Sequence, residues 1–152
     1  MTCPGCADHH AVEDLLHDYA DAVDAGDFAR VGALFARGRL FPLPGSAYVV
    51  EGADAVTALY TATTRVHPDT GTPGTQHLVG NVRVRVDAAA GTATASSRFQ
   101  VTQARPDLPL QVIATGRYAD TFTRHDDGWW FTTRTIDLQH TGDLSQHLLV
   151  EV

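Results

Sequence analysis

The sequence contains no lysine: all 11 of its basic residues are arginines, set against 18 acidic residues, and the formal net charge is −7. Catalysis through a lysine Schiff base is therefore excluded. The arginines form no basic run, whereas nucleic acids and anionic membrane surfaces bind proteins through clusters of Lys and Arg. We therefore expect neither as a partner, which leaves small molecules and other copies of the chain.

Long hydrophobic runs are also missing. The apolar runs extend over only a few residues, whereas a membrane-spanning helix needs about 20. The first residues, Met1-Thr-Cys-Pro-Gly-Cys6, have neither the basic start nor the apolar stretch of a secretory signal. These features favour a cytoplasmic protein.

Metal and cofactor motifs are scarce. Cys3 and Cys6 form a Cys-x-x-Cys pair, which can bind a metal or be redox-active. The pair precedes any periodic segment and has no second pair downstream, so we interpret residues 1–9 as a flexible tail. The sequence has no phosphate-binding loop, dinucleotide fingerprint or Gly-x-Ser-x-Gly motif, and we expect neither a cofactor nor a bound metal.

The residues that are present are typical of one globular domain. The chain has 152 residues, of which 43% are hydrophobic and 19% are charged, enough to bury a sizeable core. Helical spacing of apolar side chains predicts a helix over residues 10–25 that ends at Gly26, and a second helix capped by Asp27. A short strand near residues 48–50 and a third helix over 53–63 follow.

From residue 76 onward the apolar period changes to two, which predicts antiparallel strands. The strands cover residues 76–86, 92–103, 110–124 and 129–139. Helices followed by strands predict an α+β fold in which one strongly curved sheet is wrapped by about three helices into a cone, with a pocket at its mouth. We expect one domain over residues 10–142 and a C-terminal tail over 143–152, which covers either the cone mouth or a neighbouring molecule.

The first helix offers a tyrosine and a carboxylate for chemistry. At about 100° per residue, Tyr19 lies near the centre of the apolar stripe, and Asp24 lies roughly 110° from that centre, in the last turn. Asp21 falls on the solvent side. Asp24 is therefore the carboxylate able to reach the edge of the pocket, although its position also fits a solvated acid near a helix end.

His77 begins the first long strand. Alternation places it opposite Leu78 and Val82, and the spacing leaves open whether its side faces the pocket or the solvent. Histidine titrates near neutrality and suits proton transfer, and a paired carboxylate fixes its tautomer and raises its basicity. A hydrogen-bonded structural histidine is the competing interpretation.

We expect substrate contacts from five further residues: Tyr48, Asn81, Phe99, Gln103 and Arg117. A mid-sheet arginine such as Arg117 can bind an anionic group of a substrate. The alternative role for such an arginine is a structural ion pair, for which Asp120 is a candidate partner.

Three segments together resemble a known family. They are Asp18-Tyr-Ala-Asp-Ala-Val-Asp-Ala-Gly-Asp27-Phe, Thr75-Gln-His-Leu-Val-Gly-Asn81, and Gly116-Arg-Tyr-Ala-Asp-Thr-Phe122 followed by Gly128-Trp-Trp-Phe131. Over about residues 10–142 the chain resembles the SnoaL-like family of the nuclear-transport-factor-two-like superfamily. The resemblance implies a cystatin-like α+β barrel that commonly dimerises through its sheet.

Within the superfamily, the chain is most similar to the group of scytalone dehydratase, bile-acid dehydratase and dehydrochlorinase. Their Asp at the end of the first helix and their His in a Thr-Gln-His-like strand start match Asp24 and His77, and a Tyr five residues before the Asp matches Tyr19. The resemblance implies a His–Asp dyad that removes a proton next to a carbonyl or on a ring. Gln103 stands near the place of a second His, and Val23 replaces a Tyr, so scytalone itself is not the expected substrate.

The expected function is a cofactor-independent, dehydratase-like lyase or isomerase acting on a small, largely apolar, cyclic or aromatic molecule. Two alternatives stay open. A polyketide cyclase would use the same Asp–His base in an aldol step. A non-catalytic ligand-binding or dimerisation module is also compatible, because a fold alone does not fix a function.

Overall fold

The computed structural model describes residues 4–151 of the chain. In chain order its elements are α1 (Pro4–Ala25), α2 (Phe28–Leu34), β1 (Arg39–Phe41), β2 (Val50–Glu51), α3 (Ala53–Thr63), β3 (Thr75–Asp87), β4 (Thr92–Arg105), β5 (Leu108–His125) and β6 (Gly128–Thr141). The strands form one sheet in the order β2-β1-β6-β5-β4-β3. Neighbouring strands are antiparallel except β1 and β6, which run parallel. The predicted α+β class with a mostly antiparallel sheet is confirmed.

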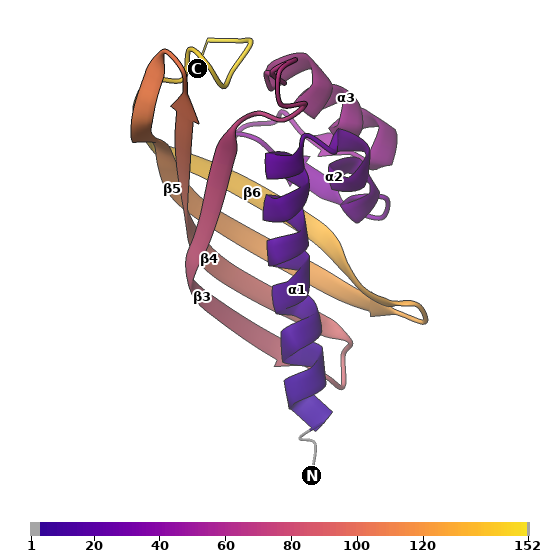
Figure 1. The fold of residues 1–152 in the computed structure, drawn as a ribbon. Helices are drawn as coiled ribbons and strands as arrows, with labels where there is room; N and C mark the ends of the chain where they lie inside the picture. The colour runs from indigo at the N-terminus through magenta and orange to yellow at the C-terminus, as the bar shows by residue number, and fades with distance from the viewer. Residues whose placement is uncertain (1–3, 152) are drawn as a thin grey trace.

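The sheet is curved, and α1 lies along its inner face while α2 and α3 pack together at one end (Figure 1). The segment after β6 returns to this same end and lies near α3, far from the start of α1. The three predicted helices and the curved sheet therefore combine as expected. Within the described residues, no helix is long and apolar enough to cross a membrane.

The first helix begins earlier than its apolar spacing predicts. It starts at Pro4 instead of residue 10, so residues 4–9, which we expected in a flexible tail, are helical. Proline fits the first turn of a helix because its missing N–H needs no partner there. Cys6 is exposed on this first part of the helix, and Cys3 lies outside the described residues. The helix ends as predicted before Gly26, whose φ of 71° is in the left-handed region.

The other predicted elements lie close to their expected bounds. Asp27 caps α2 by accepting a hydrogen bond from the backbone N–H of Arg30 at 3.0 Å. The helix expected over residues 53–63 has those bounds, and the four long strands are each extended by a few residues. Strand β1 was not predicted, because its three residues are defined by pairing with β6, far away in the sequence.

A β-bulge in β3 decides which way His77 faces. The register with β4 shifts between Gly80 and Arg83, and Asn81 takes a left-handed φ of 51°. Before the bulge His77 pairs with Val101, and after it Val84 pairs with Ala95, so both face the inner side with the buried residues of β4. The expectation that His77 and the later valines face opposite sides is therefore wrong, since the extra residue inverts the alternation.

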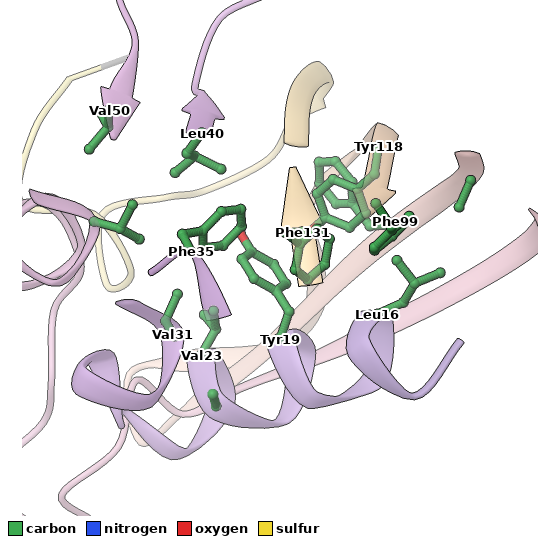
Figure 2. Close-up of a cluster of buried hydrophobic side chains, with 14 of the residues drawn as sticks. Leu16, Tyr19, Val23, Val31, Phe35, Leu40, Val50, Phe99, Tyr118 and Phe131 are labelled. Atoms are coloured by element: carbon green, nitrogen blue, oxygen red, sulfur yellow. The ribbon is translucent and has the colours of Figure 1, made fainter. Parts of the chain in front are cut away.

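Aromatic side chains fill the space between α1 and the sheet. Figure 2 shows Tyr19 projecting from α1 into this cluster, with Phe131 beside it and Tyr118 next to Phe99. Phe99 and Tyr118 are stacked with centroids 4.5 Å apart, and Phe131 stacks on Phe35 at 4.9 Å. This packing fixes α1 against the sheet, and with it the side chains that α1 presents to the pocket.

Candidate active site

A pocket of about 690 Å³ lies at the end of the molecule where α3 and the segment after β6 meet the sheet. Its volume is in the range of ordinary small-molecule sites. Apolar and aromatic side chains form most of the wall, including Val23, Leu40, Leu59, Phe99, Val101, Ile136, Leu138, Leu144 and Leu148. The wall also contains polar side chains, among them His77, His147 and four tyrosines, and their positions show what chemistry the pocket can support.

Asp24 and His77 form a hydrogen-bonded pair in this wall. The Nδ1 atom of His77 lies 2.6 Å from Oδ1 of Asp24, and the backbone N–H of His77 donates to Oδ2 at 2.7 Å. The hydroxyl of Thr75 donates to Oδ1 at 2.8 Å. His77 lines the pocket, whereas Asp24 stands behind it, and their side chains are 8% and 22% exposed. The last turn of α1 and the first residues of β3 thus hold the dyad in place.

The surroundings of Asp24 keep it ionised. Burial on its own would raise the pKa of the Asp24 carboxyl, but the hydrogen bonds and charge of His77 and the hydroxyl of Thr75 outweigh burial and lower that pKa below its ordinary value. A carboxylate only accepts hydrogen bonds, so Nδ1 of His77 carries a proton. The other ring nitrogen, Nε2, is then the atom of the imidazole that is available to exchange a proton with a bound molecule.

Tyrosine hydroxyls gather on the pocket side of α1. The hydroxyl groups of Tyr19 and Tyr60 are hydrogen-bonded to each other, and both residues line the pocket with Tyr118. Burial raises the pKa of Tyr19, although Arg134 and the bond to Tyr60 oppose it. Burial and the neighbouring Tyr19 raise the pKa of Tyr60 well above its ordinary value. These phenols are therefore neutral hydrogen-bond donors at neutral pH.

A buried ion pair lies beneath the tyrosines. Arg134 donates from Nε to Asp120 at 2.8 Å and from Nη2 at 2.9 Å, and both side chains are fully buried. The guanidinium carbon lies 4.2 Å from the ring centroid of Tyr19 and 3.9 Å from that of Tyr118. The alternative role considered for a mid-sheet arginine, an ion pair with Asp120, is therefore filled by Arg134.

Comparison with known protein families finds a match to the SnoaL-like domain over residues 6–135. The chain belongs to the SnoaL-like family. A comparison with curated proteins finds no match.

Solved structures with a similar fold are also found. A nuclear-transport-factor-two-like protein with a cystatin-like fold from Novosphingobium aromaticivorans is 23% identical, with a TM-score of 0.73 over 93% of this chain and 87% of that one. A proposed scytalone dehydratase from the same organism is 21% identical, with a TM-score of 0.70 over 91% and 89%. ActVI-ORFA from Streptomyces coelicolor is 18% identical, with a TM-score of 0.69 over 88% and 98%. At these identities the likeness shows the fold.

The SnoaL-like pocket includes only some of the expected substrate contacts. Tyr48 and Phe99 line it. Asn81 is exposed beside a separate surface depression of about 310 Å³, and Arg117 is exposed on the sheet. Gln103 is buried, and its amide donates to backbone carbonyls at 2.9 and 3.0 Å. Asn81, Gln103 and Arg117 are therefore corrected to positions outside the pocket.

Four residues important to the site were not among those expected. Thr75 precedes His77 by two residues, so strand alternation alone puts both on one side. Tyr60 lies in the apolar stripe of α3, where the spacing predicts only a core residue. Arg134 lies mid-sheet, where an arginine suits either an anionic group of a substrate or a structural ion pair. His147 lines the pocket from the C-terminal segment, and its one sequence signal is the pair of leucines, 144 and 148, that flank it.

One group of side chains on α1 has the geometry of a metal site. The ligand atoms of His9, His10 and Glu13 lie within 4.8 Å of one another. His10 is 75% exposed at its side chain, and Glu13 is 11 residues before Asp24, roughly 16 Å along the helix. This surface group is separate from the pocket and contributes nothing to its chemistry.

Proposed function

We propose that this SnoaL-like protein is a cofactor-independent lyase or isomerase of the dehydratase type. The observation that carries the proposal is the pair of contacts from Asp24 to His77, one to the ring and one to the backbone, which holds the imidazole in the wall of an apolar pocket. The second ring nitrogen, Nε2, then serves as the general base.

In the proposed reaction His77 removes a proton from the carbon next to a carbonyl group. The electron pair of the broken C–H bond forms an enolate, and Asp24 stabilises the imidazolium. In an elimination the enolate pair forms a C=C bond, and hydroxide leaves the next carbon with the proton from His77, giving water. In an isomerisation His77 returns the proton to a different carbon.

The tyrosine hydroxyls supply the complementary half of the site. Tyr19 and Tyr60 stay protonated, so either hydroxyl can donate to the enolate oxygen as its charge develops. No arginine lines the pocket within the described residues, and its one carboxylate, Glu151, is exposed. The lining thus favours an uncharged, largely apolar ring compound.

Self-association through the sheet stays a prediction.

The test measures proton abstraction directly. Deuterium exchange next to the carbonyl of 1-decalone in D₂O, followed by NMR, reports the base without requiring a leaving group. Asp24→Asn and His77→Ala should each lower the exchange rate by about 10²–10⁴, and Tyr19→Phe by about 10². Each removes one proton-transfer or hydrogen-bonding group.

Asp21→Asn is the matched control, because Asp21 is an exposed carboxylate on the same helix. It should exchange like the wild type. Wild-type rates in both dyad variants would overturn the proposal. Binding of 1-decalone by the wild type without any exchange would instead support a non-catalytic binding module.

A further inference from the structure

The segment after β6 forms part of the pocket wall. It is attached to the body of the protein by backbone hydrogen bonds, from the N–H of Arg65 to the carbonyl of His147 at 2.8 Å and from the N–H of Leu149 to that of Thr63 at 2.9 Å. Leu144 and Leu148 from this segment line the pocket. Of the two placements expected for the C-terminal tail, the structure has the one at the mouth of the cone.

His147 is the buried polar residue that this segment brings to the pocket. Its exposed fraction is only 8%, and its Nδ1 atom is buried without a hydrogen-bond partner. Five buried side-chain atoms in residues 4–151 have no partner, on Arg65, Ser97, Gln103, Arg134 and His147. Among these five residues, His147 is the one that lines the pocket.

A neighbouring histidine shows what a purely structural role looks like. His67 is equally buried, but its Nε2 lies 2.9 Å from the carbonyl oxygen of Gln146, and it does not line the pocket. The amide of Gln103 donates to the same carbonyl at 3.0 Å. The peptide group before His147 is therefore held from two sides, while the imidazole itself has an unused hydrogen-bonding atom.

The imidazole of His147 is neutral at neutral pH. Burial lowers its pKa to about 4; His77 and His67 add to this effect, and Asp24 opposes it. A neutral imidazole offers one donor and one acceptor. A buried polar atom without a partner costs free energy comparable to a lost hydrogen bond, so a ligand that supplies the partner gains affinity.

We propose that His147 binds a hydroxyl group of the substrate, distinct from the carbonyl oxygen at Tyr19 and Tyr60. The substrate class is then a neutral cyclic hydroxyketone. This inference rests on the proposed function for the placement of the carbonyl, and it adds the residue that recognises the hydroxyl group.

Binding of a matched pair of ligands tests the proposal. 1-Decalone and 3-hydroxy-1-decalone differ only in the hydroxyl group, and the Asp24→Asn background slows turnover while Kd is measured by calorimetry. His147→Phe should reduce the preference for the hydroxylated ligand by about 5- to 50-fold, the effect of one buried hydrogen bond. His147→Gln, which keeps hydrogen-bonding atoms, should restore part of it.

Leu148→Ala is the control, because Leu148 lines the same wall without a polar group. It should weaken both ligands equally, and thermal unfolding of each variant shows that it is folded. An unchanged preference in His147→Phe, as expected if water already serves the imidazole, would overturn the proposal, as would failure of both ligands to bind. Turnover is measured separately in the wild type: a preference that depends on His147 without turnover would overturn the proposed function and leave this inference standing.

Discussion

Two acid–base pairs in the described residues, Asp120–Arg134 and Asp24–His77, differ in burial and in whether the basic partner can lose its proton. Asp120 and Arg134 are fully buried and joined by two parallel hydrogen bonds between sheet strands. Asp24 and His77 are partly exposed, and His77 lines the pocket. Arginine keeps its proton under all ordinary conditions, whereas histidine exchanges one near neutrality. The sealed pair therefore supplies a fixed charge beneath the tyrosines, and the pair at the pocket can take part in proton transfer.

The two carboxylates differ in what their removal leaves behind. Without Asp120, the guanidinium of Arg134 remains charged in a site with no exposure, because it cannot lose its proton. Without Asp24, His77 can stay neutral. Burial of an acidic group is therefore a poor guide to its chemical role, and the ability of its partner to change protonation is a better one.

The largest effect on stability is expected at the sealed pair. Asp120→Ala should lower the free energy of unfolding by about 3–5 kcal/mol, because it leaves an uncompensated buried charge. Asp24→Ala should lower the free energy of unfolding by about 1–2 kcal/mol, since it removes hydrogen bonds but leaves no buried charge without a partner. Urea unfolding at pH 7 measures both. Equal losses in the two variants would remove the distinction between the pairs.

Acid should affect the pocket through His147. Its pKa is lowered to about 4 in the folded protein, so protons bind the unfolded chain more readily. The free energy of unfolding is therefore unaffected by His147 above its ordinary pKa of about 6.5. It falls as pH decreases toward 4, by up to about 3 kcal/mol. The pKa of Asp24 is also lowered, so its contribution persists down to its ordinary value near 3.8 and is lost only below it.

Urea unfolding between pH 7 and pH 4 tests this assignment. His147→Phe should flatten the fall in stability relative to the wild type, because the titrating group is gone. The same variant of a paired histidine, His67→Phe, should lose stability at every pH through its broken bond to Gln146. Identical pH slopes for the wild type and His147→Phe would refute the lowered pKa of His147.

Most of the fold could be predicted because its signals are local. Apolar spacing, Gly26 and Asp27 were sufficient for the helices, and alternation was sufficient for the long strands. Strand β1 could not be found in this way, because it exists through its pairing with β6. The early start of α1 at Pro4 was also missed, since residues 4–9 carry no apolar stripe that periodicity can detect.

Site residues could be predicted where their position depends only on nearby sequence, and not where it depends on contacts with distant segments. Tyr19 and Asp24 lie on one regular helix, so angles along that helix are enough to expect Tyr19 to be buried and Asp24 to lie at the border of the apolar stripe, where it is half-buried. The positions of Gln103 and Arg117 depend on which face each strand presents to α1 and on where the C-terminal segment lies. Local spacing of residues predicts neither. His147 joins the pocket only through contacts between the C-terminal segment and residues far from it in sequence.

The orientation of His77 could not be predicted from strand alternation, because one extra residue, Asn81, interrupts the alternation in β3. Asn81 adds the extra position that lets His77 and the later valines share the inner face, and its side chain is exposed, so its conformation matters more than its contacts. Asn81→Gly should change the free energy of unfolding by less than about 0.5 kcal/mol, because glycine adopts a φ of 51° freely. Asn81→Val should cost about 1–2 kcal/mol, since a β-branched residue is strained there. If urea unfolding gave the same stability for both variants, the left-handed conformation at Asn81 would not be what maintains the bulge, and the orientation of His77 would need another cause.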